Sequence, residues 1–102
     1  MEIKTNKSYT VKNWFGSKMA QEIGRNVTMC DVFAVMKETE KAVYAMLNLG
    51  TNCRKCTWVP KSVLIEREIG EGADHEMHYE TIIEADYNTA VEKFQAHWND
   101  FI

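Results

Sequence analysis

Two cysteines and two histidines are the residues of this chain whose spacing is typical of a metal site. Two residues separate Cys53 from Cys56, two separate His75 from His78, and eighteen residues lie between the pairs. Thiolate sulfur and imidazole nitrogen are the ligands that Zn²⁺ takes in tetrahedral sites, and four protein ligands leave no position for a catalytic water. The sequence therefore predicts one structural zinc ion held by these four side chains.

Two other interpretations of the same residues stay open. Cys-x-x-Cys is also the spacing of dithiol redox sites, where Arg54 and Lys55 would lower the thiolate pKa. Such motifs usually lie at the start of a helix that follows a buried strand. Trp58 and Pro60, soon after the cysteines, are not typical of the start of a helix. Alternatively, the four side chains have no joint role. If only one histidine binds metal, Asp74 or His97 can complete the ligand set.

The sequence shows no pattern typical of an enzyme. The segment from His75 to His78 lacks the third intervening residue of the metalloprotease helix, and the cysteines precede the histidines, unlike the order in zinc deaminases. No catalytic triad, phosphate-binding glycine loop or dinucleotide fingerprint is present. We therefore predict that the protein is not an enzyme.

Charge is divided unevenly along the chain. Residues 1–65 carry ten Lys or Arg against five Asp or Glu, whereas residues 66–102 carry two against ten, so the net charges are +5 and −8. The acids are densest in residues 66–86. A field of that sign repels nucleic acid and attracts basic protein surfaces.

The pattern of apolar and turn-forming residues predicts an α+β fold. We expect a helix over 13–24, capped by Asn13 and stopped by Gly24, then a hairpin of strands 27–36 and 42–49. The cysteines follow on a tight turn, before a short strand over 57–59 and a helical turn over 61–64. Residues 66–74 are expected as an acidic loop and 79–85 as a strand. Asp86 or Asn88 then caps a helix that runs to Phe101.

These elements make one domain over residues 1–102, with a small antiparallel sheet of three or four strands, an N-terminal helix, a C-terminal helix and a zinc knuckle. Six aromatic residues fall on faces expected to be buried, so we predict that they are core residues and not a base-stacking platform: Trp14, Phe15, Tyr44, Trp58, Phe94 and Trp98. No apolar run approaches the roughly 20 residues of a transmembrane helix, and no signal peptide is recognisable. We expect a cytoplasmic monomer that does not associate with a membrane.

Residues 35–64 resemble small proteins that phages and mobile elements of Gram-positive bacteria carry. The resemblance rests on a hairpin followed by Thr57-Trp58-Val59-Pro60-Lys61-Ser62-Val63-Leu64, and it covers under a third of the chain. Among such small acidic phage proteins are the anti-CRISPR inhibitors of Cas9, some of which bind metal. This chain is similar to those inhibitors in its size, its pairs of possible zinc ligands and its charge.

That resemblance implies a function in a bacterial host cell. The partner would be a Cas9-type nuclease, which holds its guide and target in positively charged channels. The partner-binding residues would lie in the acidic segment, with exposed members of Tyr79, Met77 and Ile69 as anchors beside Glu71, Asp74, Glu76 and Glu80. The alternative is a phage zinc module that associates with nucleic acid through the basic residues Lys4, Lys7, Lys12, Lys18 and Arg25.

Overall fold

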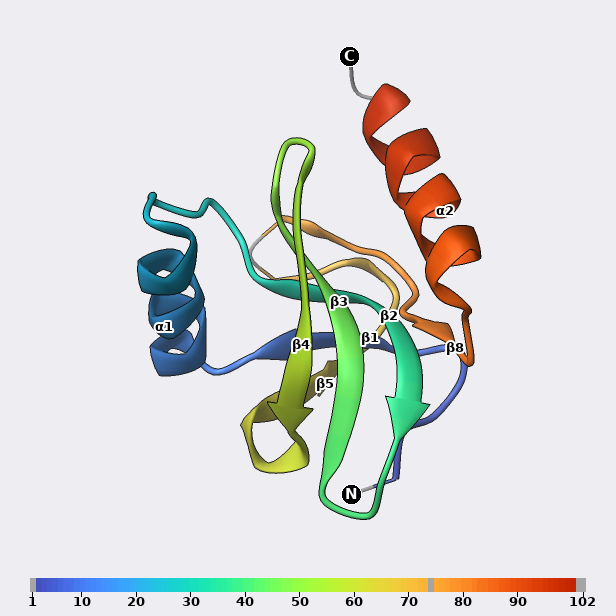
Figure 1. The fold of residues 1–102 in the computed structure, drawn as a ribbon. Coiled ribbons are helices and arrows are strands. Elements are labelled where there is room, and N and C mark those ends of the chain that lie inside the picture. Colours follow the sequence, from blue (N-terminus) through green and yellow to red (C-terminus); the bar gives the residue numbers. More distant parts are fainter. Residues whose placement is uncertain (1, 74, 101–102) are drawn as a thin grey trace.

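A computed structural model describes residues 2–73 and 75–100 of the chain. The described residues form an α+β fold in which α1 and α2 lie on either side of a central sheet (Figure 1). In chain order the elements are β1 (Ser8–Val11), α1 (Asn13–Ile23), β2 (Asp31–Glu38), β3 (Ala42–Gly50), β4 (Cys53–Pro60), the 3-10 helix η1 (Lys61–Val63), β5 (Leu64–Arg67), β6 (Gly70–Glu71), β7 (Met77–His78), β8 (Ile82–Ile83) and α2 (Tyr87–Asn99).

The central sheet has more strands than the three or four predicted. Its order is β4-β3-β2-β1-β5, with antiparallel neighbours, and β8 adds a short parallel pairing to β2. The missed strands are β1 and β5, which pair Tyr9 with Glu66 and Val11 with Leu64 across more than half the chain. Each has four residues, too few for an apolar alternation to stand out in the sequence.

Both faces of the sheet are buried. In β3, Val43, Ala45 and Leu47 pack in the core cluster that also contains Phe15 and Met19 of α1. Met46, between them, points to the opposite face and packs with Phe94 and Ala90 of α2. Because side chains alternate between the two faces of a strand, a central strand covered on both sides is apolar at nearly every position. This explains the continuous apolar run of β3.

The β2–β3 hairpin confirms the predicted pair of strands, with a later start. Residues 25–30 lie outside any strand, and pairing begins at Asp31 opposite Asn48. The turn is closed by a hydrogen bond of 2.8 Å from the Thr39 amide to the Ala42 carbonyl. Register shifts after Val32 and Val35 change the face to which β2 side chains point.

Both helices are confirmed, with one wrong cap. Gly24 ends α1 in the left-handed conformation at φ 72°, as glycine does readily. The residue before α1 is Lys12, without a side-chain cap, so Asn13 is the first helical residue and not the cap. Asp86 caps α2 by accepting a 2.8 Å hydrogen bond from the Thr89 amide. The predicted end of this helix at Phe101 lies outside the described residues.

The segment after η1 differs most from the prediction. Residues 66–74 contain the end of β5 and all of β6 and are not one loop, and the predicted strand over 79–85 is reduced to Ile82–Ile83. Two of the six aromatics expected in the core are largely exposed, Trp14 at 58% and Trp58 at 47%, whereas Phe15 and Phe94 are buried.

Candidate functional site

The structure places the two cysteines of the predicted zinc site on a strand, which begins at Cys53 directly after the turn at residues 51–52. Cys53 and Cys56 both belong to β4, which pairs with β3 from Cys53 to Pro60 with one register shift between Asn48 and Gly50. Residues three apart on a strand point to opposite faces. Accordingly, Cys53 packs against the core on the α1 side and Cys56 against the core on the α2 side.

The two histidines belong to the small hairpin β6–β7. His75 is in its turn with φ 64°, its side chain 86% exposed and its Nδ1 3.1 Å from the Glu71 carboxylate. His78 is in β7 opposite Gly70 and is partly buried. Across residues 2–73 and 75–100, no three His, Cys, Asp or Glu side chains come close enough together to hold a metal.

The described residues do not bring the four predicted ligands together: Cys53 and Cys56 lie on β4, and the histidines lie on the hairpin β6–β7. Zinc binding therefore remains a prediction from the spacing. The surroundings of Cys56 oppose formation of a thiolate. Burial raises the pKa of Cys56, and this outweighs the opposite effect of Arg54. Cys30, outside the motif, has its pKa raised to about 12, mainly by burial.

The predicted partner-binding residues do gather on one feature, which we call the acidic hairpin and define as residues 69–80 without Asp74, which lies outside the described residues. Its strands pair Gly70 with His78 and Glu71 with Met77, and they belong to a sheet of their own. Hydrogen bonds of 2.9 Å from the Gly72 amide to the Glu76 carbonyl and from the His75 amide to the Gly72 carbonyl close its turn.

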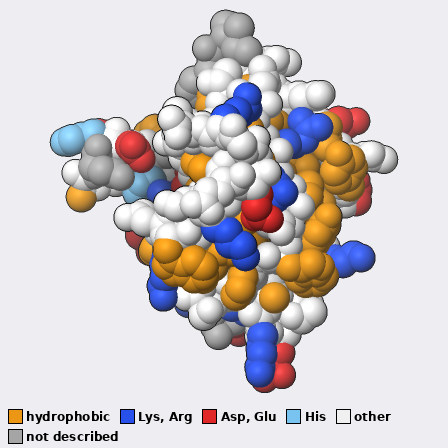
Figure 2. All heavy atoms as spheres, turned by 60° about the vertical axis from the view of Figure 1, so that its left-hand side comes forward, with side chains coloured by type: hydrophobic (Ala, Val, Ile, Leu, Met, Phe, Trp, Pro, Cys, Tyr) orange, Lys and Arg blue, Asp and Glu red, His pale blue; other side chains and the backbone are white. Residues whose placement is uncertain are grey.

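The acidic hairpin projects from the domain and carries large apolar side chains among its acids. At the left of Figure 2, acidic, apolar and histidine side chains gather on a lobe that stands away from the body. Ile69 is 45% exposed, Met77 51% and Tyr79 46%. Glu71, Glu76 and Glu80 are exposed too. Exposed apolar groups between like charges are what a protein-docking surface presents.

Aromatic contacts connect the acidic hairpin to α2. The ring centroid of Tyr79 lies 4.9 Å from that of His97, edge to face, and His97 lies 5.8 Å from Phe33. Burial lowers the pKa of His97, and Asp100 opposes this in part. Burial thus favours the neutral form of this imidazole.

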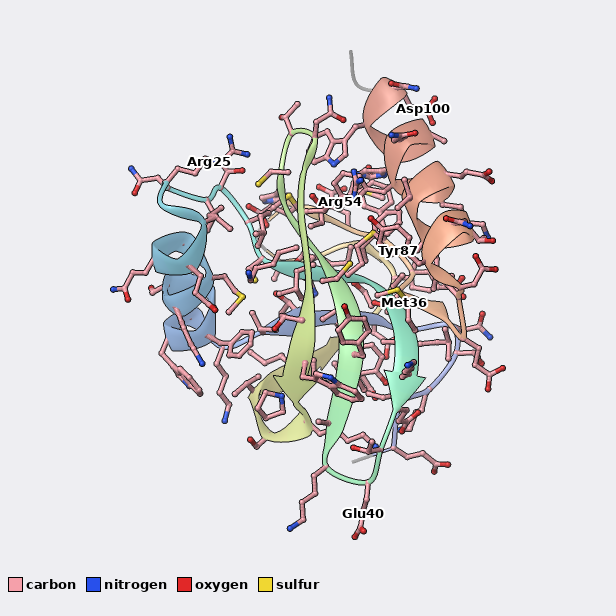
Figure 3. The ribbon with its side chains drawn as sticks, viewed as in Figure 1. Arg25, Met36, Glu40, Arg54, Tyr87 and Asp100 are labelled. Atoms are coloured by element: carbon pink, nitrogen blue, oxygen red, sulfur yellow. The ribbon has the colours of Figure 1, made fainter. Side chains whose placement is uncertain are left out.

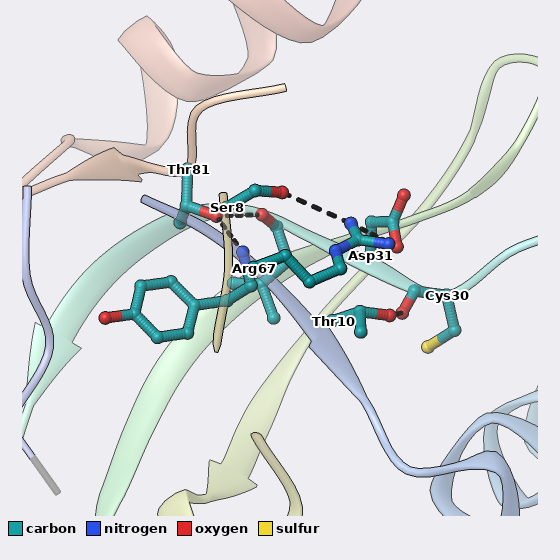
Figure 4. A network of polar contacts seen from close by, with 8 residues as sticks. Ser8, Thr10, Cys30, Asp31, Arg67 and Thr81 are labelled. Carbon is teal, nitrogen blue, oxygen red and sulfur yellow. Dashed lines mark hydrogen bonds and ion pairs between the residues drawn. The ribbon is translucent and has the colours of Figure 1, made fainter. Parts of the chain in front are cut away.

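A polar network fixes both ends of the segment that contains the acidic hairpin (Figure 4). On the N-terminal side, the Arg67 guanidinium donates to Asp31 at 3.1 Å and to Ser8 at 3.2 Å. On the C-terminal side, the buried Thr81 hydroxyl donates to the Val32 carbonyl at 2.8 Å and accepts from the Tyr9 amide at 3.0 Å.

The residues of this network were not identified from the sequence. They are single polar residues on β1, β2, β5 and the segment before β8, and no short motif joins them. The one sequence signal is Arg67, the only base between residues 66 and 86. An isolated base in an acidic run is a candidate for an internal ion pair.

Part of the basic N-terminal half is paired with the acidic half. β1 pairs with β5, so Lys4 lies 3.7 Å from Glu66 and Lys7 forms an ion pair with Glu68. The hydrogen bond to Glu68 raises the pKa of Lys7. Two of the five bases proposed for nucleic-acid binding are thus paired with acids of the other half.

No protein-family model matches this chain, and no curated protein or solved structure shows a significant match to it. Within the described residues, neither helix has the length and apolar character needed to cross a membrane.

Proposed function

We propose that this protein is an anti-CRISPR-type inhibitor, without catalytic activity of its own, that binds a Cas9-type nuclease through the acidic hairpin. The observation that carries the proposal is the exposure of Ile69, Met77 and Tyr79 beside Glu71 and Glu76 on a projecting hairpin. The class of partner comes from the sequence resemblance over residues 35–64 and from the charge.

Charge and apolar contacts would have different roles in this binding. Carboxylates on the hairpin increase the rate of encounter with a basic channel and select against acidic surfaces. Exposed acids alone give little affinity, because ion pairs at a surface are each worth only about 0–1 kcal/mol. Burial of a few anchors such as Met77 and Tyr79 supplies most of the binding free energy in interfaces of this kind.

The hairpin does not depend on zinc in this proposal. Arg67 on one side and Thr81 on the other are attached to β1 and β2 by the polar network, which fixes where the hairpin leaves and re-enters the domain. A structural zinc ion would add to that support without taking part in recognition.

The test is a charge reversal with a matched control. The triple variant Glu71→Lys, Glu76→Lys and Glu80→Lys changes the acidic hairpin, and the control Glu22→Lys, Glu40→Lys and Glu92→Lys makes the same change in net charge at exposed positions elsewhere. Inhibition of DNA cleavage and co-purification are measured with Cas9–guide complexes from Gram-positive hosts. We expect the control to inhibit like the native chain and the hairpin variant to lose inhibition.

Two results would contradict the proposal. If the hairpin variant, shown by circular dichroism to be folded, inhibits as well as the native chain, the acidic hairpin is not the binding surface. If the native chain neither binds nor inhibits any of these complexes, the proposed partner is wrong, whatever the variants do.

A further inference from the structure

The edge strand β4 carries positive charge, in contrast to the acidic hairpin. It ends the central sheet, pairs with β3 on one side, and has no described strand on its other side. Its eight residues include Arg54 and Lys55 and no acid. An edge strand presents unpaired backbone N–H and C=O groups along its outer side, which an incoming strand can bind.

A depression of about 480 Å³ runs beside this edge. Its lining comes from both layers of the molecule: Arg25 from the α1 side, Tyr87 from the start of α2, and both Cys53 and Cys56 of β4. Cys53 and Cys56 point to opposite faces of β4. Both can line one depression only if that depression follows the open edge of the strand, where the two faces meet. Figure 3 shows Arg25 and Tyr87 on either side of β4.

The cations at this edge have no acidic partner within the described part of the chain. Arg25 and Arg54 both line the depression, and no described carboxylate forms an ion pair with either. Arg54 lies on the α2 side, with its guanidinium carbon 5.5 Å from the centroid of the Phe94 ring. Tyr87, which also lines the depression, is 54% exposed, and Trp58, further along β4, is 47% exposed.

We propose that β4 binds an extended acidic segment of a partner protein, which adds to the sheet as a further strand. The backbone of β4 pairs with the segment, Arg25 and Arg54 bind its carboxylates, and Trp58 contacts its apolar side chains. Charge selects the occupant, because Arg54 and Lys55 repel the same edge of a second copy and attract acidic side chains. This inference does not depend on the function proposed for the acidic hairpin.

The experiment uses the full chain labelled with ¹⁵N and a short capped peptide in which Glu alternates with Val. A peptide with Lys in place of Glu is the charge control. We expect the Glu peptide to shift the amide signals of β4 and to slow their hydrogen exchange. The double variant Arg25→Gln and Arg54→Gln should bind it roughly threefold to thirtyfold more weakly. The matched variant Lys37→Gln and Lys41→Gln, at exposed positions near the end of the β2–β3 hairpin, should bind like the native chain.

Four results would overturn the proposal. The first is equal binding of the Lys peptide, and the second is an absence of β4 shifts at millimolar Glu peptide. The third is an equal response to inorganic phosphate without slowed exchange, which would indicate a small-anion site. The fourth is a dimer in sedimentation with β4 amides already protected, which would make a second copy the occupant. Because the acidic hairpin is unchanged in the double arginine variant, failure here leaves the nuclease test unaffected.

Discussion

Thr81 shows how much of this structure depends on single polar side chains. It is 1% exposed, and its hydroxyl both donates to the Val32 carbonyl and accepts from the Tyr9 amide. The Thr81 hydroxyl thus forms hydrogen bonds with backbone groups of β1 and β2, and these hold in place the residue that follows the acidic hairpin. A buried backbone group that loses its partner costs about 1–3 kcal/mol.

We therefore predict that Thr81→Val, which keeps the shape of the side chain and removes the hydroxyl, lowers the free energy of unfolding by about 1–3 kcal/mol. Urea denaturation measures the change. Thr5→Val, at an exposed position before β1, is the matched control and should leave the midpoint unchanged. Equal midpoints for Thr81→Val and the native chain would mean that other groups satisfy the Tyr9 amide and the Val32 carbonyl.

At the scale of an element, β4 changes the meaning of the Cys-x-x-Cys spacing. The same residues on a turn would point two thiols at one ion, whereas on a strand they point to opposite faces. Pairing with β3 decides between these outcomes, since each residue from Cys53 to Pro60 has a partner in β3, with one register shift between Asn48 and Gly50.

The spacing of the four ligands predicts about one zinc per chain in the untagged protein, lost in Cys53→Ser and His78→Ala and kept in Cys30→Ser. Elemental analysis and thermal melting with and without a chelator test this on the native chain and on the three variants. Zinc binding would require an arrangement of β4 and the acidic hairpin other than this one, because no three of the described ligands come together. Far less than one zinc per chain and a melting temperature unchanged by the chelator would contradict the predicted site.

At the scale of the whole molecule, folding redistributes the charge. The sequence separates a basic half from an acidic half, but the antiparallel pairing of β1 with β5 brings Lys4 and Lys7 against Glu66 and Glu68. Three further acids, Glu71, Glu76 and Glu80, lie exposed on the acidic hairpin, while Arg25 and Arg54 line one depression beside β4. The folded protein therefore has small, local charged surfaces in place of two oppositely charged halves.

A consequence is that the protein should bind nucleic acid weakly. We predict no shift of a labelled single-stranded or double-stranded oligonucleotide at low salt, because a phosphate backbone needs several unpaired cations on one face. Electrophoretic mobility at increasing salt checks this. Binding that falls steeply with salt and weakens in a Lys12→Gln and Lys18→Gln variant would favour the nucleic-acid alternative.

By itself, the sequence determined the elements whose signals are local. The helical stripe and Asp86 cap of α2, the Gly24 stop of α1 and the apolar runs of the β2–β3 hairpin each depend on residues a few positions apart. The density of acids in residues 66–86 likewise indicated where the acidic hairpin would be. These features were predictable because periodicity, capping and turn chemistry act within one or two turns of chain.

Only the tertiary structure decided which distant residues meet. Strands β1 and β5 exist because they pair with each other and because β1 also pairs with β2. Hydrogen bonds of Arg67 with Asp31 and of Thr81 with Val32 join segments far apart in the chain, and the faces of Cys53 and Cys56 follow from the pairing of β4. A short strand has little preference of its own, since its stability comes from cross-strand contacts. The sequence gives the number of residues between two candidate ligands. Only the fold determines the directions in which their side chains point.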